Sequence, residues 1–123
     1  MGPVRTKRAY ERPEPTDGYR VLVDRLWPRG VSRDRLRLDA WVRELAPSAA
    51  LRRWFGHDPV RFPEFKRRYA QELRAGPGAQ AMAELVRRAA RGTVTLVYGA
   101  RDERHNNAAV LRDLLEGAIE GHP

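Results

Sequence analysis

Two short apolar runs, each followed at once by polar residues, predict the central strands of this protein. The first, within residues 20–24, is Val21-Leu22-Val23, and the second, within residues 93–98, is Leu96-Val97. A short run of large aliphatic and β-branched side chains is typical of a strand buried on both of its faces. Residues 4–10 alternate more loosely and carry more charge, so we expect a third strand there, at or near an edge of the sheet.

Apolar residues with helical spacing predict three longer helices. Their stripes are Phe62, Phe65, Tyr69 and Leu73; Met82, Leu85, Val86 and Ala89; and Val110, Leu111, Leu114 and Leu115. We expect Gly76-Pro77-Gly78 to end the first helix, and Gly92 to end the second, which covers residues 79–91. Asn106 or Asn107 is expected to cap the third.

Shorter elements are predicted in the middle of the chain. Ser32 is a good N-cap for a helical turn over residues 33–36, and Ser48 for a helix over residues 51–55. Residues 38–45 fit both an alternating strand and a helix face, and we favour the strand because a proline and Ser48 follow almost at once.

Strands separated by helical segments predict a single α/β domain over residues 1–123, with a mostly parallel sheet flanked by helices. Right-handed crossovers would place the exits of strands 20–24 and 94–98 at the same edge of that sheet. The two polar loops that follow these strands are therefore expected to converge. Ligands of open α/β sheets bind at this edge.

The composition excludes several classes of protein. Hydrophobic residues make up 41% of the chain, which suits a globular domain, but no apolar run approaches the roughly 20 residues that span a bilayer. We therefore expect a cytoplasmic protein without a membrane partner. The chain has no cysteine, which excludes disulfides, thiolate metal sites and thiol nucleophiles.

The net charge of +8 suggests nucleic acid as a partner, and the basic excess lies in the first two thirds of the chain. However, the chain has 22 arginines and only two lysines, Lys7 and Lys66, alongside abundant Ala, Gly and Pro. Codon composition or heat adaptation can produce such a bias. A nucleic-acid-binding module is therefore the alternative interpretation rather than the leading one.

The two converging loops contain most of the candidate site residues. These are Asp24, Arg25, Arg29, Arg101, Asp102, His105 and Asn106. Three arginines beside a helix N-terminus favour phosphate or carboxylate, so the sequence predicts a site for a small anion. In the alternative interpretation, Asp24 and Asp102 merely pair with these arginines in a structural ion network.

Aromatic residues could complete such a site. Trp27, Trp41 and Trp54 either stack a planar ring or pack in the core, and Trp27, within the charged loop, is the best placed to line a pocket. His57 lies in the expected turn Gly56-His57-Asp58-Pro59, where Asp58 is expected to accept hydrogen bonds from nearby backbone, and is a weaker candidate.

Asp24 or His105 would handle protons if the protein is an enzyme, with Asp102 fixing the tautomer of His105. Alternatively, His105 only helps to begin the last helix. His57, His105 and His122 lack metal-ligand spacing, so we expect no metal site. The P-loop, G-x-G-x-x-G and G-x-S-x-G motifs are missing from the sequence, so kinase, dinucleotide-oxidoreductase and hydrolase-elbow chemistry is disfavoured. The sequence identifies no cofactor, and whether one is used is unknown at this point.

Four stretches of the chain, residues 21–30, 46–48, 51–59 and 95–108, resemble the YeaO-like branch of the domain-of-unknown-function 488 family. The resemblance extends over roughly residues 4–116 and implies a compact domain of Rossmann-like character. It implies no particular reaction. Gly99 stands where we expect Ser or Ala, which argues against a hydroxyl role there, and glycine is expected to let the chain turn sharply.

Together, these observations predict a protein that binds a small anionic (phosphate- or nucleotide-like) ligand at the loops after strands 20–24 and 94–98. Arg25, Arg29 and Arg101 would hold the anion. Hydrolysis or modification of the ligand is a further hypothesis. A non-catalytic nucleic-acid-binding module and a protein-interaction domain stay open as alternatives.

Overall fold

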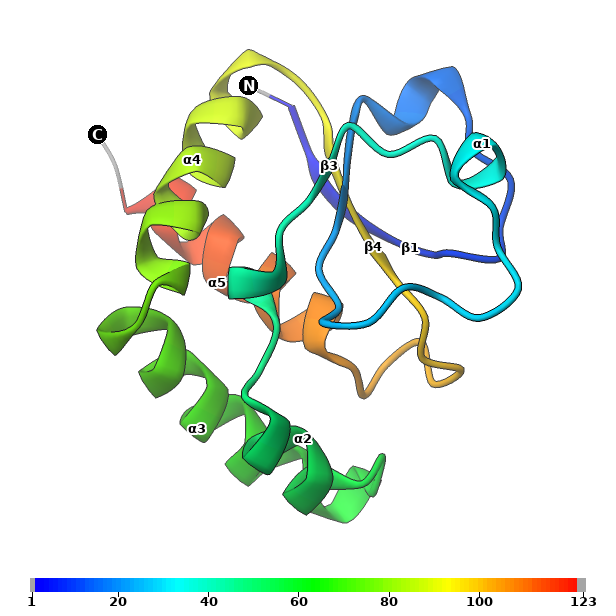
Figure 1. Ribbon diagram of the computed structural model, residues 1–123. Coiled ribbons are helices and arrows are strands. Elements are labelled where there is room, and N and C mark those ends of the chain that lie inside the picture. The colour runs from blue at the N-terminus through cyan, green and yellow to red at the C-terminus, as the bar shows by residue number, and fades with distance from the viewer. Residues whose placement is uncertain (1, 122–123) are drawn as a thin grey trace.

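The computed structural model describes residues 2–121, so His122 lies outside the described residues. A four-stranded sheet lies between a layer of helices on one face and a layer of loops with one short helix on the other (Figure 1). The strands are β1 (Val4–Arg8), β2 (Tyr19–Leu22), β3 (Ala40–Trp41) and β4 (Val94–Tyr98), in the order β1-β4-β2-β3. All neighbouring strands are parallel. This is the predicted α/β fold, with β1 at an edge.

Three of the five α-helices follow the predicted apolar stripes, and the other two begin after the predicted caps Ser32 and Ser48. The five are α1 (Arg33–Leu36), α2 (Ala49–Phe55), α3 (Phe62–Ala75), α4 (Gly78–Arg91) and α5 (Asn107–Glu120). Single 3-10 turns occur at Pro15–Asp17, Arg43–Leu45 and Pro59–Arg61. Among the described residues, no helix is long and apolar enough to cross a membrane.

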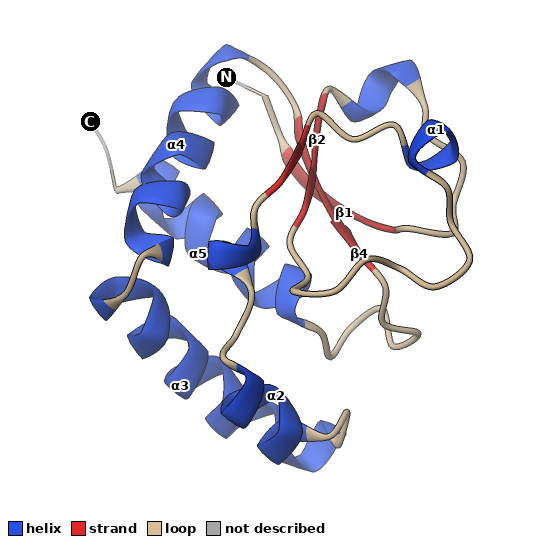
Figure 2. Ribbon diagram, in the orientation of Figure 1, coloured by secondary structure: helices blue, strands red, loops and turns tan. Residues whose placement is uncertain are grey.

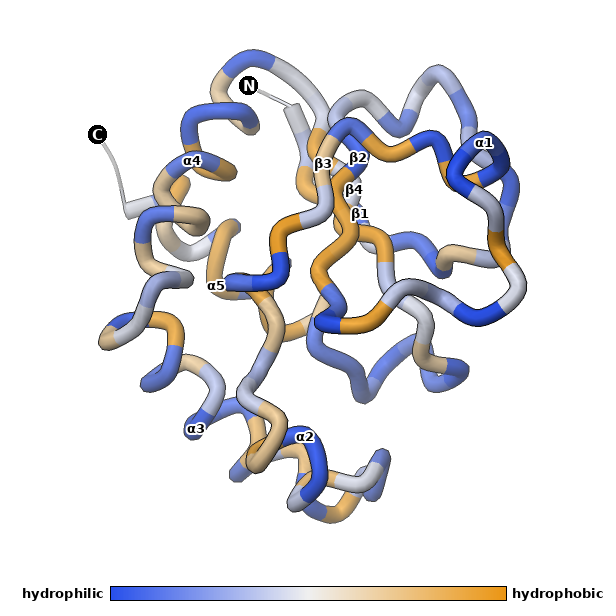
Figure 3. The backbone as a smooth tube through the Cα atoms, viewed as in Figure 1, coloured by the Kyte–Doolittle hydropathy of each residue, from blue (hydrophilic) through white to orange (hydrophobic). Residues whose placement is uncertain are grey.

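Alternating side chains of the central strands feed two separate apolar clusters. Val21 and Leu96 pack in the main core against α2 to α5, whereas Leu22 and Val97 point into a smaller cluster on the opposite face. Figure 3 shows the hydrophobic stretches gathered at the centre of the sheet, with hydrophilic residues around them. Because both faces of the sheet are covered, the central strands contain runs of consecutive apolar residues.

The predicted helix caps are confirmed. The Ser32 hydroxyl accepts a hydrogen bond from Arg35 N at 3.1 Å, and the Ser48 hydroxyl accepts one from Leu51 N at 3.1 Å. At the start of α5, Asn106 is the cap, because its side-chain oxygen accepts from Ala109 N at 2.8 Å. Caps depend on residues within one turn, so local sequence is enough to locate them.

The strand favoured over residues 38–45 is correct in type but too long. Only Ala40 and Trp41 pair with β2, opposite Val21 and Leu22, and a 3-10 turn follows from Arg43. Since β2 itself ends at Leu22, β3 has no partner backbone along which to continue. In Figure 2, most of the chain between β2 and α2 is accordingly loop.

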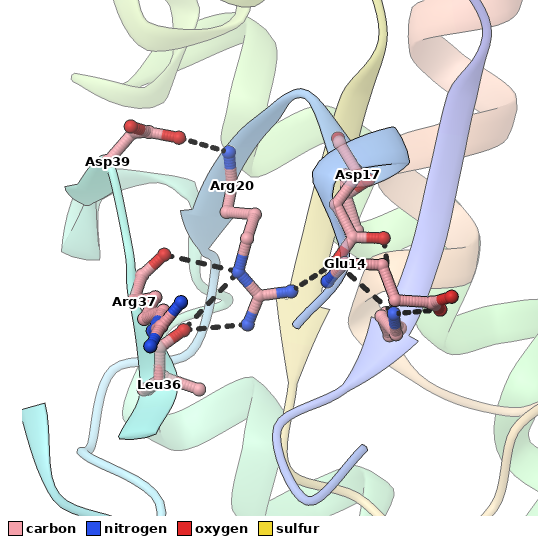
Figure 4. Close-up of polar contacts among 8 residues, drawn as sticks. Glu14, Asp17, Arg20, Leu36, Arg37 and Asp39 are labelled. Carbon is pink, nitrogen blue, oxygen red and sulfur yellow. Dashed lines mark hydrogen bonds and ion pairs between the residues drawn. The ribbon is translucent and has the colours of Figure 1, made fainter. Parts of the chain in front are cut away.

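A buried ion network joins three parts of the fold (Figure 4). The Arg20 guanidinium donates to Asp17 Oδ2 at 2.7 Å and to the carbonyl oxygens of Leu36 and Arg37, where α1 ends. Lys7 of β1 donates to the same carboxylate at 3.1 Å. The Asp17 and Arg20 side chains are each only 5% exposed. This Asp17 network (Lys7, Asp17 and Arg20) therefore fixes β1, β2 and α1 relative to one another.

Candidate functional site

A cavity of about 570 Å³ opens at the carboxyl ends of β2 and β4, where the sequence predicts that two loops converge. We call it the carboxyl-edge cavity. Its wall comes from the loop after β2, from α2 with the turn that follows, and from the junction of β4 with α5. Apolar side chains dominate the lining, and a few polar groups project from it. This is the usual make-up of a small-molecule site.

Asp24 provides the carboxylate of this cavity. It lies two residues after the end of β2, and its Oδ2 accepts a hydrogen bond from Gly99 N at 2.8 Å. Its Oδ1 accepts from Asn107 Nδ2 at 3.1 Å, and the same amide also donates to Val23 O at 3.0 Å. The exits of β2 and β4 are therefore joined through the Asp24 side chain, which holds it in one position.

Burial raises the pKa of the Asp24 carboxyl above its ordinary value. The hydrogen bonds from Asn107 and Gly99, and the more distant charges of Arg52 and His57, lower that pKa and offset part of the effect. Both hydrogen-bond donors are neutral, and within residues 2–121 Asp24 takes part in no ion pair. A carboxylate placed in this way is available to a ligand.

Gly99 gives the Asp24 carboxylate room to approach the backbone. A Cβ atom at this position would lie 3.3 Å from Asp24 Oδ2, which is tighter than an ordinary contact. The expectation that glycine serves a sharp turn here is wrong, because the glycines with positive φ are Gly18, Gly30 and Gly56. The missing side chain is explained by the carboxylate it faces.

Two aromatic side chains form firm walls of the carboxyl-edge cavity. Trp27 donates from Nε1 to Val31 O at 2.6 Å and packs edge-on against Trp41, with ring centroids 5.4 Å apart. Phe55 stacks on Phe65 at a centroid distance of 4.3 Å. Because these rings are fixed by their neighbours, the walls are already formed before any ligand binds.

The third tryptophan lies elsewhere. Trp54 does not line the carboxyl-edge cavity, and the guanidinium groups of Arg61 and Arg68 lie 5.3 Å and 4.3 Å from its ring centroid. A wall built from all three tryptophans is therefore wrong. Trp27 alone lines the cavity, and Trp41 supports it from behind.

Three arginines surround the cavity, and we call them the arginine rim. Arg25 and Arg29 come from the loop after β2, and Arg52 comes from α2. All three side chains are exposed; Arg25 donates weakly to Pro47 O at 3.4 Å. Within the described residues, none of the three pairs with a carboxylate. The arginine rim thus leaves its positive charge available for an anion.

The loop after β4 contributes less than expected. Arg101, Asp102 and His105 do not line the carboxyl-edge cavity, whereas Asn106 does. The Asp102 carboxylate accepts from Arg104 N at 2.9 Å and His105 N at 3.0 Å, and these backbone hydrogen bonds lower its pKa.

The histidine ring is held by the same carboxylate. His105 Nδ1 lies 2.8 Å from Asp102 Oδ2, and the ring packs edge-on against Phe62 at a centroid distance of 5.1 Å. Asp102 and His105 therefore organise the start of α5. The interpretation in which Asp24 and Asp102 pair with the predicted site arginines is also wrong, since their partners are neutral donors and His105.

The structure adds residues that the sequence reasoning missed. Arg52 and Phe55 reach the cavity from α2, and Asn107 positions Asp24 from α5. His57, a weaker candidate, also lines the cavity, and its φ of 58° marks the sharp turn after α2. In the sequence, what pointed to Arg52, Phe55 and His57 was that residues 51–59 resemble the YeaO-like family. Nothing in the helical spacing of α2 points to the cavity.

Across residues 2–121, no group of three or more His, Cys, Asp or Glu side chains could hold a metal ion. The charged or ionisable groups in the lining of the carboxyl-edge cavity include one carboxylate, one imidazole and the arginine rim. This set can accept hydrogen bonds at its floor and bind negative charge at its mouth.

Comparisons with known proteins agree with the resemblance. A family model described as "Inactive DUF488-N3 subclade" matches residues 3–122. An uncharacterized protein of Mycobacterium tuberculosis strain H37Rv is 46% identical over 114 residues, which are 93% of this chain and 94% of the relative. The uncharacterized protein YeaO of Escherichia coli K12 is 40% identical over 112 residues, 91% of this chain and 96% of the relative. No solved structure gives a significant match. The chain therefore belongs to the DUF488 family, as a YeaO-like member whose matching model describes the inactive DUF488-N3 subclade.

Proposed function

We propose that this protein binds a small anionic ligand of nucleotide-like character in the carboxyl-edge cavity. The observation that carries the proposal is the combination of a cavity of about 570 Å³, apolar aromatic walls and three arginines that pair with no carboxylate of residues 2–121. A volume in this range suits a small organic ligand. Guanidinium groups favour phosphate because their geometry matches its oxygens.

Binding is better supported than turnover. The description of the matching family model names an inactive subclade. In addition, His105, one of the two residues expected to handle protons, lies outside the cavity lining, as does Asp102. The other, Asp24, is the one carboxylate among the described lining residues. A lone carboxylate already committed to two donors is better suited to hold a ligand than to transfer protons.

The test is isothermal titration calorimetry with inorganic phosphate, nucleoside monophosphates and small carboxylates, compared between wild type and two arginine variants. Arg29→Ala removes a cation from the arginine rim and should weaken binding of a nucleoside monophosphate about tenfold or more, because a hydrogen bond to a charged group contributes roughly 1.5–3 kcal/mol. Arg52→Ala should act in the same direction.

Arg101→Ala is the matched control, because it removes the same charge from an exposed position outside the cavity lining. It should leave the affinity within about twofold of wild type, since an exposed charge at a distance is screened by salt. Equal losses for Arg29→Ala and Arg101→Ala would mean that overall charge, not the cavity, attracts the anion. No heat of binding with any of these ligands would reject the proposed function.

A further inference from the structure

Asp24 restricts which ligand can enter the carboxyl-edge cavity. A carboxylate only accepts hydrogen bonds, and its two oxygens offer about four lone-pair positions in total. Two of these are taken, by Gly99 N and by Asn107 Nδ2. The remaining positions have no protein donor among the described residues, although both oxygens belong to a side chain that lines the cavity. A ligand with two adjacent donors would match the two carboxylate oxygens.

The four common nucleobases differ in how they meet such a group. Guanine offers two adjacent donors, the ring N1–H and the exocyclic N2 amino group, which match two carboxylate oxygens. Adenine and cytosine place a ring nitrogen acceptor beside their amino group, and uracil flanks its one N–H with two carbonyl oxygens. Each of these three would set an acceptor against the carboxylate, which leaves polar groups unpaired and is strongly disfavoured.

The rest of the cavity fits the same kind of ligand. Trp27 and Phe55 line it with flat, immobilised rings on which a purine can pack. The arginine rim lies at its exposed mouth, where a phosphate attached through the sugar would meet it. The carboxylate at the floor needs hydrogen-bond donors, and the cations at the mouth need a negative charge. A purine nucleotide with two donors on its base supplies both.

We propose that the carboxyl-edge cavity selects guanine nucleotides, with the N1–H and N2 amino groups on the Asp24 carboxylate and the phosphate at the arginine rim. This inference rests on the proposed function and names the ligand class within it. It assigns to Asp24 the role of specificity-determining residue, and to Gly99 and Asn107 the role of positioning residues that fix the carboxylate.

The experiment is a calorimetric series with guanosine, inosine, xanthosine and adenosine monophosphates on the wild-type protein. Inosine monophosphate lacks only the N2 amino group, so we expect it to bind about tenfold more weakly than guanosine monophosphate. Xanthosine monophosphate replaces that amino group with a carbonyl oxygen, and adenosine monophosphate has an acceptor at N1. Both should bind at least about 100-fold more weakly than guanosine monophosphate.

Asp24→Asn supplies an independent arm. Its amide pairs one acceptor with one donor, so the variant should lose most of its preference for guanosine over xanthosine monophosphate, and a thermal unfolding curve shows whether it folds. Full retention of the preference in a folded variant overturns the assignment to Asp24. If the variant does not fold, the wild-type series decides alone.

The outcomes separate the two proposals. Equal affinities for guanosine and adenosine monophosphates, or for guanosine and inosine monophosphates, overturn the guanine assignment and leave the anionic site standing. Failure of every nucleotide to bind overturns both. The graded order guanosine, then inosine, then xanthosine and adenosine monophosphates supports both, because each step removes or opposes one hydrogen bond to the same carboxylate.

Discussion

Asp24 is partly buried and has no ion partner within residues 2–121, and both properties bear on what the site can bind. The chain fixes its carboxylate with two neutral donors, Gly99 N and Asn107 Nδ2, and leaves Arg52 and His57 too far away to pair with it. Buried charges are usually paired, because removing them from water is costly. A partly buried carboxylate that only neutral donors hold therefore points to function more strongly than the many exposed charges of this protein.

The first prediction concerns the pKa of this side chain. Carbon-13 NMR titration of the aspartate carboxyl groups should give Asp24 a pKa above the ordinary value of 3.8, because burial disfavours its charged form. Asn107→Ala removes one hydrogen bond to the carboxylate, so the pKa of Asp24 should rise further. Asp102 provides an internal control, since backbone hydrogen bonds from Arg104 and His105 place its pKa below 3.8 in the same spectra.

The sign of the pH dependence follows from this shift. A raised carboxyl pKa means that the folded state binds the Asp24 proton more tightly, so the ionised side chain lowers stability as pH rises through that pKa. A ligand that donates hydrogen bonds to the carboxylate needs the ionised form. Its affinity should therefore fall as pH falls through the pKa of Asp24. An Asp24 pKa at or below 3.8 would contradict the burial argument.

At the scale of elements, the Asp17 network joins β1, β2 and α1, which have few other contacts with one another. Arg20 links β2 to the carbonyl groups at the end of α1, and Lys7 brings in β1. Burial alone would raise the pKa of Asp17, but the Glu14 backbone N–H and the two cations outweigh it and lower that pKa. The network therefore stabilises the fold as long as Asp17 is ionised.

Replacing Asp17 should accordingly be costly. Asp17→Ala leaves Arg20 as a nearly buried cation without a carboxylate and leaves Lys7 with the exposed Glu14 alone. We expect a loss of about 3 kcal/mol in the free energy of unfolding, measured by urea denaturation at pH 7. Glu14→Ala is the matched control. Glu14 also pairs with Lys7, at 2.8 Å, but it is 61% exposed, so its loss should cost less than about 1 kcal/mol.

Acid should reveal the same difference. Because the pKa of Asp17 is lowered in the folded state, its contribution is present above the unfolded value of 3.8 and is lost as pH falls through the folded value. Wild type should therefore lose more stability than Asp17→Ala between pH 5 and about pH 2. Equal costs for Asp17→Ala and Glu14→Ala at pH 7 would show that the network is not a stabilising element.

For the molecule as a whole, local sequence predicted what depends on a few neighbouring residues. The central strands and the Ser32 and Ser48 caps follow from runs and side chains within one element, and parallel neighbours bring the exits of β2 and β4 together. What could not be predicted depends on packing. Arg52 reaches the cavity only because α2 docks against this edge, and Arg101 misses it although its loop starts beside Gly99.

The arginine-rich composition was the least reliable guide to function. Arg20 is buried and structural, and Arg67 and Arg68 bind Glu64 on their own helix at 2.8 Å. Arg43 stacks on Trp41 at 4.0 Å from its ring centroid. These structural arginines contribute as much to the net charge as the arginine rim does. The net charge therefore overstates the positive surface that a polyanion could use. Only the tertiary structure separates the two groups.

The last prediction uses this separation to test the nucleic-acid alternative. Binding of a nucleoside monophosphate and of a single-stranded 12-mer should be titrated from 50 to 200 mM salt. The arginine rim surrounds one cavity and can neutralise one or two phosphates, so neither ligand should give a log-log slope steeper than about −1.4. A nucleic-acid-binding surface would instead bind the 12-mer more tightly, with a slope of about −0.7 for each phosphate contacted. A slope steeper than about −4 for the 12-mer alone would therefore favour nucleic-acid binding at the basic surface over ligand binding in the cavity.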